Sequence, residues 1–321
     1  MTPRHKQRSI LGAVLAGAAY GLLVRVAFEW KVLHAFLQIV SIAFLIVCPF
    51  SVGAIAVLRS AGQQSISLYR QFIVALLAMS IFLVAMFATL LEGLICLVLV
   101  APVFIVAALI GGFIAGIFHN YFRATKSTVA AFALLPLLLA PVESFMPPVE
   151  SVQSVTNTIH ISASPERVFS QIGNVRDIRP EELGTTFVHF IGLPKPVAAD
   201  MRCNTAGCVR TSHWEKNVWF QEVITEWDEP NAMHYRFVIP SGGVPREALD
   251  RHVEIGGEYF DLIDGGYDLT RMRDGSTKLS LTTRFVNKSQ LRVYGDLWGK
   301  MVLKDFHRSI LHLMKLRSER A

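Results

Sequence analysis

Long, uninterrupted apolar runs fill the first 145 residues of the chain. A helix that crosses a bilayer needs about 20 mostly apolar residues. Four runs reach that length: Ile10–Phe28, Ala35–Leu58, Phe72–Leu91 and Leu94–Phe118. A fifth run, Val129–Phe145, is shorter and contains two prolines, so it either spans the bilayer or lies at its surface. The pattern predicts a multi-pass helical membrane region of about five helices.

After residue 145 the pattern changes to short alternations of apolar and polar positions. Residues 155–162 alternate as a strand does, and Ser164-Pro165 then supplies the cap and the first-turn proline that begin a helix. Further strands are predicted at 218–227, 233–239, 253–262, 267–272 and 278–286. Residues 264–266 are a predicted turn, and residues 289–317 a predicted long final helix.

These patterns divide the chain into two regions of different kinds. Residues 1–145 are the predicted transmembrane domain, residues 146–153 a proline-containing linker and residues 154–321 one further domain. One strand, a short helix, a run of antiparallel strands and a long terminal helix are typical of an α+β domain. We expect a curved antiparallel sheet that wraps around the final helix.

The charged residues are distributed unequally between the two regions. Only 12 of the first 145 residues are charged, compared with 44 of the following 176. The net charge of +6 arises entirely in the membrane region, because acidic and basic residues balance in the rest of the chain. A nucleic-acid-binding domain needs a basic patch of its own, so we expect no nucleic-acid partner.

The short loops between the apolar runs predict an orientation. Seven basic residues flank the membrane on the side of the N-terminus: Arg4, Lys6, Arg8, Arg59, Arg70, Arg123 and Lys126. The opposite loops hold two, which places the N-terminus in the cytoplasm of an inner-membrane protein. Five spans put the C-terminal domain in the periplasm, and four would leave it in the cytoplasm. Two GxxxG pairs, Gly17 with Gly21 and Gly112 with Gly116, suit close packing, including packing on a membrane-protein partner.

The C-terminal domain resembles a known superfamily. Its opening, IHISASPERVFSQIGNV at 159–175, is similar to the start of START-like helix-grip domains, which include polyketide cyclases and lipid-transfer domains. Four later segments resemble a membrane-tethered branch of that superfamily: IGLPKPVAAD, FQEVITEWDEP, HVEIGGEYFD and DFHRSILHLMKLRSE. The resemblance implies a sheet of about seven strands, an apolar cavity under the last helix and no single chemistry.

This resemblance, together with the strand faces, suggests that the domain binds a lipid-like, apolar or amphipathic ligand for sensing or transfer, without a cofactor. The expected ligand contacts are Tyr235, Phe237, Tyr259, Leu281, Phe285, Trp298 and Val302. Four tryptophans of the domain either line the cavity or belong to the core: Trp214, Trp219, Trp227 and Trp298. One alternative is an enzyme of the cyclase or dehydratase kind. Another is a membrane scaffold whose pocket is vestigial.

Two polar residues are candidates for anchoring the ligand or for proton transfer. Glu222 lies in the middle of an otherwise apolar strand, where burial would raise the pKa of its carboxyl. It is also placed to be a structural partner for an arginine such as Arg210. His252 and Glu254 are two residues apart on one predicted strand face, where they either bind a polar head group or form a solvated pair.

The two cysteines of the C-terminal domain leave two interpretations open. Cys203 and Cys208 form a disulfide if the domain is extracytoplasmic, and otherwise they are free thiols. Together with His213 they lack the fourth ligand and the spacing of a zinc site, so no metal is expected. The sequence contains no GxSxG, HExxH, P-loop or GxGxxG motif.

Overall fold

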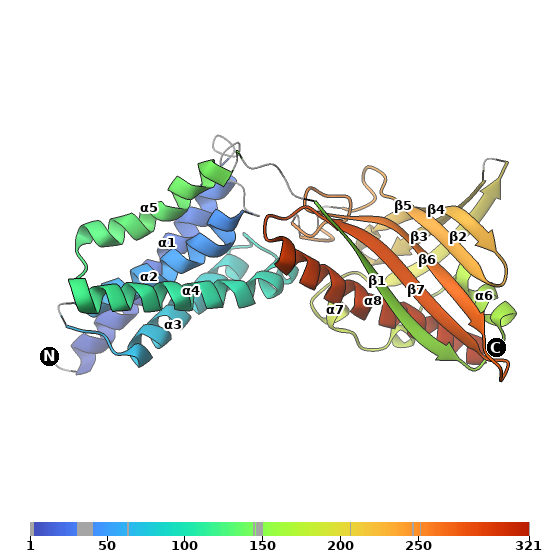
Figure 1. The fold of residues 1–321 in the computed structure, drawn as a ribbon, viewed down its shortest axis with the longest axis horizontal. Coiled ribbons are helices and arrows are strands. Elements are labelled where there is room, and N and C mark those ends of the chain that lie inside the picture. The colour runs from blue at the N-terminus through green and yellow to red at the C-terminus, as the bar shows by residue number, and fades with distance from the viewer. Residues whose placement is uncertain are drawn as a thin grey trace. The chain divides into compact units, whose positions relative to one another are not determined.

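The structure is a computed structural model, and it describes residues 3–30, 41–62, 64–143, 145, 150–205, 207–245, 247–250 and 252–320. The chain divides into two compact units, Met1–Pro148 and Val149–Ala321 (Figure 1). Of the expected linker, residues 146–149 lie outside the described residues. A strand already begins at Ser151, because residues 151–153 continue the alternation that follows them.

The first unit is entirely helical in its described part. Its elements are α1 (Pro3–Glu29), η1 (Ala43–Val47), α2 (Cys48–Ala61), α3 (Leu68–Ala88), α4 (Leu94–Phe122) and α5 (Lys126–Glu143). Among the described residues, five segments are long and apolar enough to cross a membrane: Ile10–Phe28, Ala43–Ala61, Leu68–Ala88, Leu94–Phe122 and Lys126–Glu143. The fifth keeps both of its prolines inside the helix. Part of the second expected run, residues 35–40, lies outside the described residues.

Small residues let these helices approach closely. A Cβ atom on Gly53 of α2 would lie 1.9 Å from the carbonyl oxygen of Ala108 in α4, so the two backbones touch there. The glycines of the two GxxxG pairs also pack against α2 or α3 of the same unit. An additional partner on these glycine faces stays a prediction.

One buried ion pair links α1 to the turn between α3 and α4. Arg25, near the end of α1, donates from Nε to the carboxylate of Glu92 at 2.9 Å, and from Nη2 to the carbonyl oxygen of Leu91 at 2.9 Å. Glu92 lies in the turn between α3 and α4. Arg25 is 1% exposed, so its charge is compensated inside the unit rather than by water.

The second unit is a seven-stranded antiparallel sheet in the order β1-β7-β6-β5-β4-β3-β2. Its strands are β1 (Ser151–Ile161), β2 (Pro196–Asn204), β3 (Gly207–Trp214), β4 (Trp219–Asp228), β5 (Ala232–Val238), β6 (Phe260–Arg271) and β7 (Thr277–Asn287). Between β1 and β2 lie α6 (Pro165–Gly173), η2 (Pro180–Leu183) and α7 (Phe187–Phe190), and η3 (Glu215–Asn217) follows β3. The α+β prediction is confirmed.

The last helix, α8 (Arg292–Arg320), runs along one face of the sheet (Figure 1). Its backbone packs against β1 and β7, and α6, η2 and α7 pack against it from the side. A core of apolar side chains from α6, α8 and strands β5–β7 fills the space beneath its C-terminal half, and it includes Phe169, Met233, Leu279, Leu313 and Met314. Burying such side chains is the main stabilising term of the domain.

Two sequence-based predictions about the strands were wrong. Residues 253–259 are not a strand, and the predicted turn at 264–266 lies inside β6. The glycines are there because side chains of β5 cross β6 at this point. A Cβ atom on Gly265 would lie 3.1 Å from the hydroxyl of Tyr235, and one on Gly266 would lie 2.1 Å from the ring of His234. The hairpin of β2 and β3 was also not predicted.

Candidate ligand-binding interior

The strand alternation gathers one set of side chains on the face of the sheet that α8 covers. Residues two apart on a strand share a face. Arg210 of β3 is paired with Glu222 of β4, and Glu222 is paired with Phe237 of β5. Because the register is antiparallel throughout, these three side chains lie in one row across the sheet.

Arg210 and Glu222 form a buried ion pair. Each is 4% exposed, and Nε of Arg210 donates to the Glu222 carboxylate. Nη1 of Arg210 donates to the carbonyl oxygen of Ile172, at the end of α6, at 2.6 Å. Glu222 therefore has the arginine partner that the sequence suggested for it, Arg210. This carboxylate is already bound by a guanidinium.

Two tyrosine rings complete the surroundings of Arg210. Its guanidinium carbon lies 5.3 Å from the ring centroid of Tyr235 and 5.7 Å from that of Tyr267, which is cation–π geometry. Burial raises the pKa of both tyrosines, so both hydroxyls stay protonated. Burial lowers and the Glu222 carboxylate raises the pKa of Arg210, with a net upward shift, so the guanidinium stays charged.

A continuous row of aromatic rings runs from this ion pair to α8. We call Tyr235, Phe237, Phe220, Trp214 and Phe306 the aromatic row. Successive ring centroids are 5.2, 5.7, 5.6 and 4.7 Å apart. The last contact is a stack between Trp214, at the end of β3, and Phe306 of α8. The backbone of α8 packs against β1 and β7. The large rings of the aromatic row connect α8 to the other strands of the sheet, β3, β4 and β5.

The N-terminal half of α8 adds a second aromatic group. Trp298, Val302 and Phe306 are spaced by four residues and so share one face of the helix. Phe187 of α7 stacks on Trp298 with ring centroids 6.5 Å apart, and His189 of α7 meets Phe306 edge-on at 5.9 Å. α7 is fixed in place by the Val188 amide, which donates to Oδ2 of Asp305 at 2.9 Å.

Several polar atoms in this interior have no hydrogen-bond partner among the described residues although they are buried. They include Nε1 of Trp214, Nε1 of Trp298, Oγ1 of Thr186 and Nδ1 of His307. The other ring nitrogen of His307 lies 2.9 Å from the hydroxyl oxygen of Thr283 on β7. Burial lowers the pKa of His307 to about 4, so its ring is neutral at neutral pH. Buried polar groups without partners are rare in native proteins.

The strand order and the position of α8 together decide the type of fold. An antiparallel seven-stranded sheet covers a long C-terminal helix, and the short helices α6 and α7 are inserted after the first strand. Residues 150–320 adopt the helix-grip fold. The fold implied by the sequence resemblance is thereby confirmed, whereas the membrane-tethered branch stays a prediction.

The comparisons add distant structural similarities. No family model and no curated protein matches the chain. The chain is similar to the Zhui aromatase/cyclase from Streptomyces sp. R1128, with 13% identity, coverage of 53% of this chain and 96% of the other, and a TM-score of 0.33. It is also similar to a protein from Nitrosospira multiformis (17% identity, 52% and 97% coverage, TM-score 0.31). A Thalictrum norcoclaurine synthase mutant shows 6% identity, 54% and 97% coverage and a TM-score of 0.34. Such distant matches assign no function to the chain.

The expected ligand contacts of the helix-grip domain fall into three groups. Tyr235 and Phe237 belong to the aromatic row, and Trp298 and Val302 lie on the matching face of α8. Leu281 and Phe285 are 3% and 0% exposed and pack in the core, Leu281 with the large cluster and Phe285 with Val155 and Leu303. For all of these residues, a role as ligand contacts stays a prediction.

Tyr259 and His252 lie elsewhere. Their rings are 5.9 Å apart, and both precede β6. His252 and Glu254 are not on a strand, contrary to the sequence-based expectation, because residues 253–259 do not pair in the sheet. Sequence reasoning also did not single out Phe220 and Phe306. Their apolar spacing on a strand and on a helix was visible, but their meeting across the domain was not.

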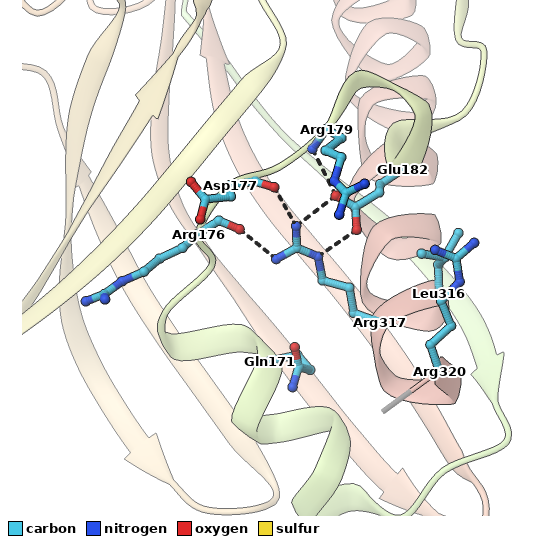
Figure 2. Close-up of a pocket in the computed structure, with 8 residues that line it drawn as sticks. All are labelled: Gln171, Arg176, Asp177, Arg179, Glu182, Leu316, Arg317 and Arg320. Atoms are coloured by element: carbon cyan, nitrogen blue, oxygen red, sulfur yellow. Dashed lines mark hydrogen bonds and ion pairs between the residues drawn. The ribbon is translucent and has the colours of Figure 1, made fainter.

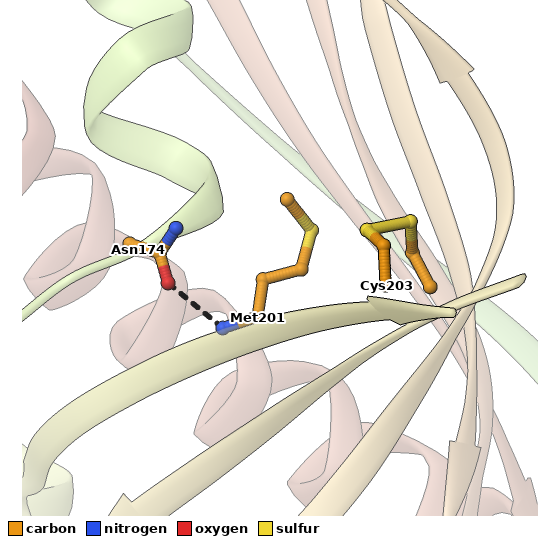
Figure 3. Close-up of a disulfide and its surroundings, with 4 residues drawn as sticks. Asn174, Met201 and Cys203 are labelled. Atoms are coloured by element: carbon orange, nitrogen blue, oxygen red, sulfur yellow. Dashed lines mark hydrogen bonds between the residues drawn. A yellow bond between two sulfur atoms is a disulfide. The ribbon is translucent and has the colours of Figure 1, made fainter.

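The two cysteines of the helix-grip domain are bonded to each other. Cys203 and Cys208 face each other across the β2–β3 hairpin in a disulfide (Figure 3). The same hairpin is tied to the end of α6, because the amide of Met201 donates to Oδ1 of Asn174 at 2.8 Å. Among the described residues no group of three or more potential ligands is arranged to hold a metal ion.

A separate hollow of about 390 Å³ lies on the surface of the domain (Figure 2). It is lined by Gln171, Arg176, Asp177, Arg179, Glu182, Leu316, Arg317 and Arg320. Arg317 is not free for a ligand: it donates to both carboxylate oxygens of Glu182 at 3.0 and 2.8 Å and to two backbone carbonyl oxygens. These hydrogen bonds lower the pKa of Glu182. The hollow therefore surrounds a structural clamp between α8 and η2.

Proposed function

We propose that the helix-grip domain binds a lipid-like ligand beneath the N-terminal half of α8, beside the aromatic row, and that the membrane unit holds this domain at a bilayer for sensing or transfer. The observation that carries the proposal is the pair of buried indole N–H groups, on Trp214 and Trp298, that have no partner among the described residues. Each indole stacks on a further aromatic ring, Trp214 on Phe306 and Trp298 on Phe187.

The chemistry of this interior specifies the kind of ligand. A buried donor without an acceptor costs about 1–3 kcal/mol, and a ligand that carries an acceptor oxygen removes that cost. Indole N–H groups only donate, so the ligand needs a carbonyl, ester, carboxylate or hydroxyl oxygen. The aromatic rings offer its remaining part an apolar surface. An amphipathic molecule with an oxygen-bearing head and an apolar body meets both requirements.

The arrangement favours a carrier over the cyclase or dehydratase alternative. A general base must reach the proton that it removes, and one oxygen of the Glu222 carboxylate already accepts a hydrogen bond from Arg210. The other candidate, His252, lies in the segment before β6, outside the aromatic row. Glu222 and Arg210 together are therefore better suited to close the far end of the interior.

The proposed location is the extracytoplasmic side of an inner membrane. Five candidate spans and the basic loops near the N-terminus support it. The disulfide gives independent support, because disulfides persist in oxidising compartments. External protease added to spheroplasts should degrade the domain while leaving the membrane unit, and degradation only after lysis would place the domain in the cytoplasm instead.

The binding proposal is tested by identifying what the domain carries. The full chain is purified with a protease site between Glu143 and Ser151, the domain is released, and native mass spectrometry with solvent extraction detects bound molecules. A reproducible lipid-like mass is expected. Val302→Trp should displace it by filling the helix face between Trp298 and Phe306. The matched substitution Val238→Trp, at a residue that is 40% exposed, should not. Absence of any bound molecule after incubation with membrane lipids would refute the proposal.

A further inference from the structure

One side of α8 exposes a line of large apolar side chains to solvent. Val293, Leu297 and Met301 are 80%, 62% and 40% exposed. They are spaced by four residues, so they lie one above the other on the same face of the helix. Single exposed apolar residues need no explanation, whereas a contiguous group of them marks an interaction surface.

α7 extends this surface. Phe190 is 84% exposed and Phe187 is 38% exposed. Phe187 stacks on Trp298, which is a helical neighbour of Met301 three residues further on. The ring of Phe187 therefore adjoins the line on α8 through Trp298, and the exposed Phe190 follows three residues later in the same short helix. We call Val293, Leu297, Met301, Phe187 and Phe190 the apolar face.

The charge around the apolar face is positive. The same side of α8 continues to Lys304 and Arg308, both exposed. The nearby carboxylates are directed to partners inside the domain. Asp296 accepts hydrogen bonds from Ser151 and Asn287, and Asp305 accepts from the Val188 amide, although Arg308 lies 3.9 Å from its other oxygen. Apolar side chains followed by lysine and arginine are typical of helices that lie in the interface of an anionic bilayer.

The apolar face begins at the end of the domain that is tethered to the membrane unit. Ser151, the first residue of β1, donates to Asp296 of α8 at 2.9 Å, and Ser151 is paired in the sheet with Asn287, the last residue of β7. Seven residues separate the end of α5 from Ser151. A chain of that length extends at most about 28 Å. With α5 in the bilayer, as proposed above, the linker length alone keeps Ser151 within about 28 Å of the end of that helix.

We infer that the apolar face inserts into the interfacial layer of an anionic bilayer and so opens the aromatic interior toward lipid. The inference rests on the proposed function, because Trp298 belongs to the interior and touches the apolar face. It names the bilayer as the donor or acceptor of the ligand. The basic side chains Lys304 and Arg308 would meet the lipid phosphates, while the apolar side chains lie among the first carbons of the acyl chains.

The test measures lipid contact of single positions in the full chain in nanodiscs. Leu297→Cys is labelled with an NBD fluorophore; the native Cys48 and Cys96 are buried and the other two cysteines are bonded. Ser170→Cys, on an exposed position of α6, is the matched control. In discs with about one third phosphatidylglycerol, brominated acyl chains should quench the Leu297 label roughly twofold and leave the Ser170 label unchanged. Equal quenching of the two labels would overturn the inference.

A double variant and a second readout of the Leu297 label separate the bilayer from other occupants. Lys304→Glu with Arg308→Glu should reduce quenching in anionic discs but not in discs of phosphatidylcholine alone. A Leu297 label that is shielded from water but not quenched by brominated lipid would show that protein covers the face, either a second copy or the membrane unit, and would also overturn the inference. Ligand co-purification on the same samples reports on the proposed function separately. A bound ligand with an unquenched label refutes only the docking.

Discussion

The two halves of the helix-grip interior are built on opposite principles. In the closed half, beneath α6 and the C-terminal half of α8, Arg210 is bonded to Glu222 and to Ile172, and the apolar core around them is fully buried. In the open half, beneath α7 and the N-terminal half of α8, half-exposed aromatic rings surround indole N–H groups without partners among the described residues. The halves differ in how their largest polar groups are partnered: Arg210 and Glu222 are paired, whereas the two indole N–H groups have no partner among the described residues. The closed half also buries one small group without a partner among those residues, the hydroxyl of Ser318.

This difference separates stability from binding. In the closed half, a ligand would have to displace the contacts that Arg210 and Glu222 already make, so its entry gains little. An interior with unmet donors gains both apolar burial and hydrogen bonds when a ligand enters. Substitutions in the closed half should therefore change the free energy of unfolding, and substitutions in the open half should change ligand affinity.

The largest effect is expected for Glu222→Leu. It leaves the Arg210 guanidinium buried without its carboxylate, and breaking a buried pair in this way costs about 3–5 kcal/mol. Urea unfolding of the released domain, followed by tryptophan fluorescence, measures the loss. The double substitution Arg210→Met with Glu222→Leu removes both charges and should recover most of it. If Glu222→Leu leaves stability intact but abolishes turnover of a substrate, the carboxylate is catalytic and the division into halves fails.

Acid should destabilise the domain through His307. Burial lowers the pKa of this ring from 6.5 in the unfolded chain to about 4 in the folded domain. The stability that depends on the neutral ring is fully present above pH 6.5 and is lost as the pH falls from 6.5 through 4. A shift of this size corresponds to about 3 kcal/mol at the acid limit. The free energy of unfolding, measured between pH 6.5 and 4, should fall less steeply with falling pH in His307→Gln than in the unmodified domain, because the variant has no ring to protonate. An unchanged slope would show that the ring titrates normally.

Much of the fold could be predicted because its strands alternate cleanly. Met233, Tyr235 and Phe237 face one side of β5 as expected, and the signals that begin α6 at Pro165 are local. The glycine pair at 265–266 misled for a physical reason. Its lack of side chains serves the neighbouring strand β5, whose side chains cross β6 there. A single strand's sequence does not show what an adjacent strand requires.

The candidate site could be predicted only where one element carries the signal. Trp298 and Val302 were found on a helix face, and Tyr235 and Phe237 on a strand face. Stacking between Trp214 and Phe306 joins residues 92 positions apart. It depends on how α8 is placed over the sheet, which no local pattern determines. Likewise, the absence of partners for the indole N–H groups is a property of the folded interior.

A smaller effect is expected from the disulfide, which lies outside both halves. Replacing Cys203 and Cys208 by serine opens a loop of six residues, and the chain-entropy model gives about 2 kcal/mol for a loop of that length. Ligand occupancy should be unchanged, because the hairpin tip does not touch the aromatic row. Reduction with dithiothreitol should reproduce the lower unfolding midpoint. A loss of ligand on reduction would show that the hairpin contributes to the binding site, so binding would not be confined to the open half.

The smallest and most discriminating effect is expected for Trp214→Phe. The substitution keeps an aromatic ring against Phe306 and removes an indole N–H that has no partner among the described residues. The gain from no longer burying that donor is offset by the packing that the smaller ring loses, so the stability of the apo domain should change little. The ligand loses one hydrogen bond worth about 0.5–1.5 kcal/mol, so its affinity should fall roughly twofold to tenfold. Trp227→Phe is the matched control, because Trp227 packs edge-on against Phe169 in the closed half. Titration of the ligand identified by mass spectrometry compares the two variants. Equal affinities would mean that the indole N–H of Trp214 does not meet the ligand, and the open half would then owe its binding to shape and apolar surface alone.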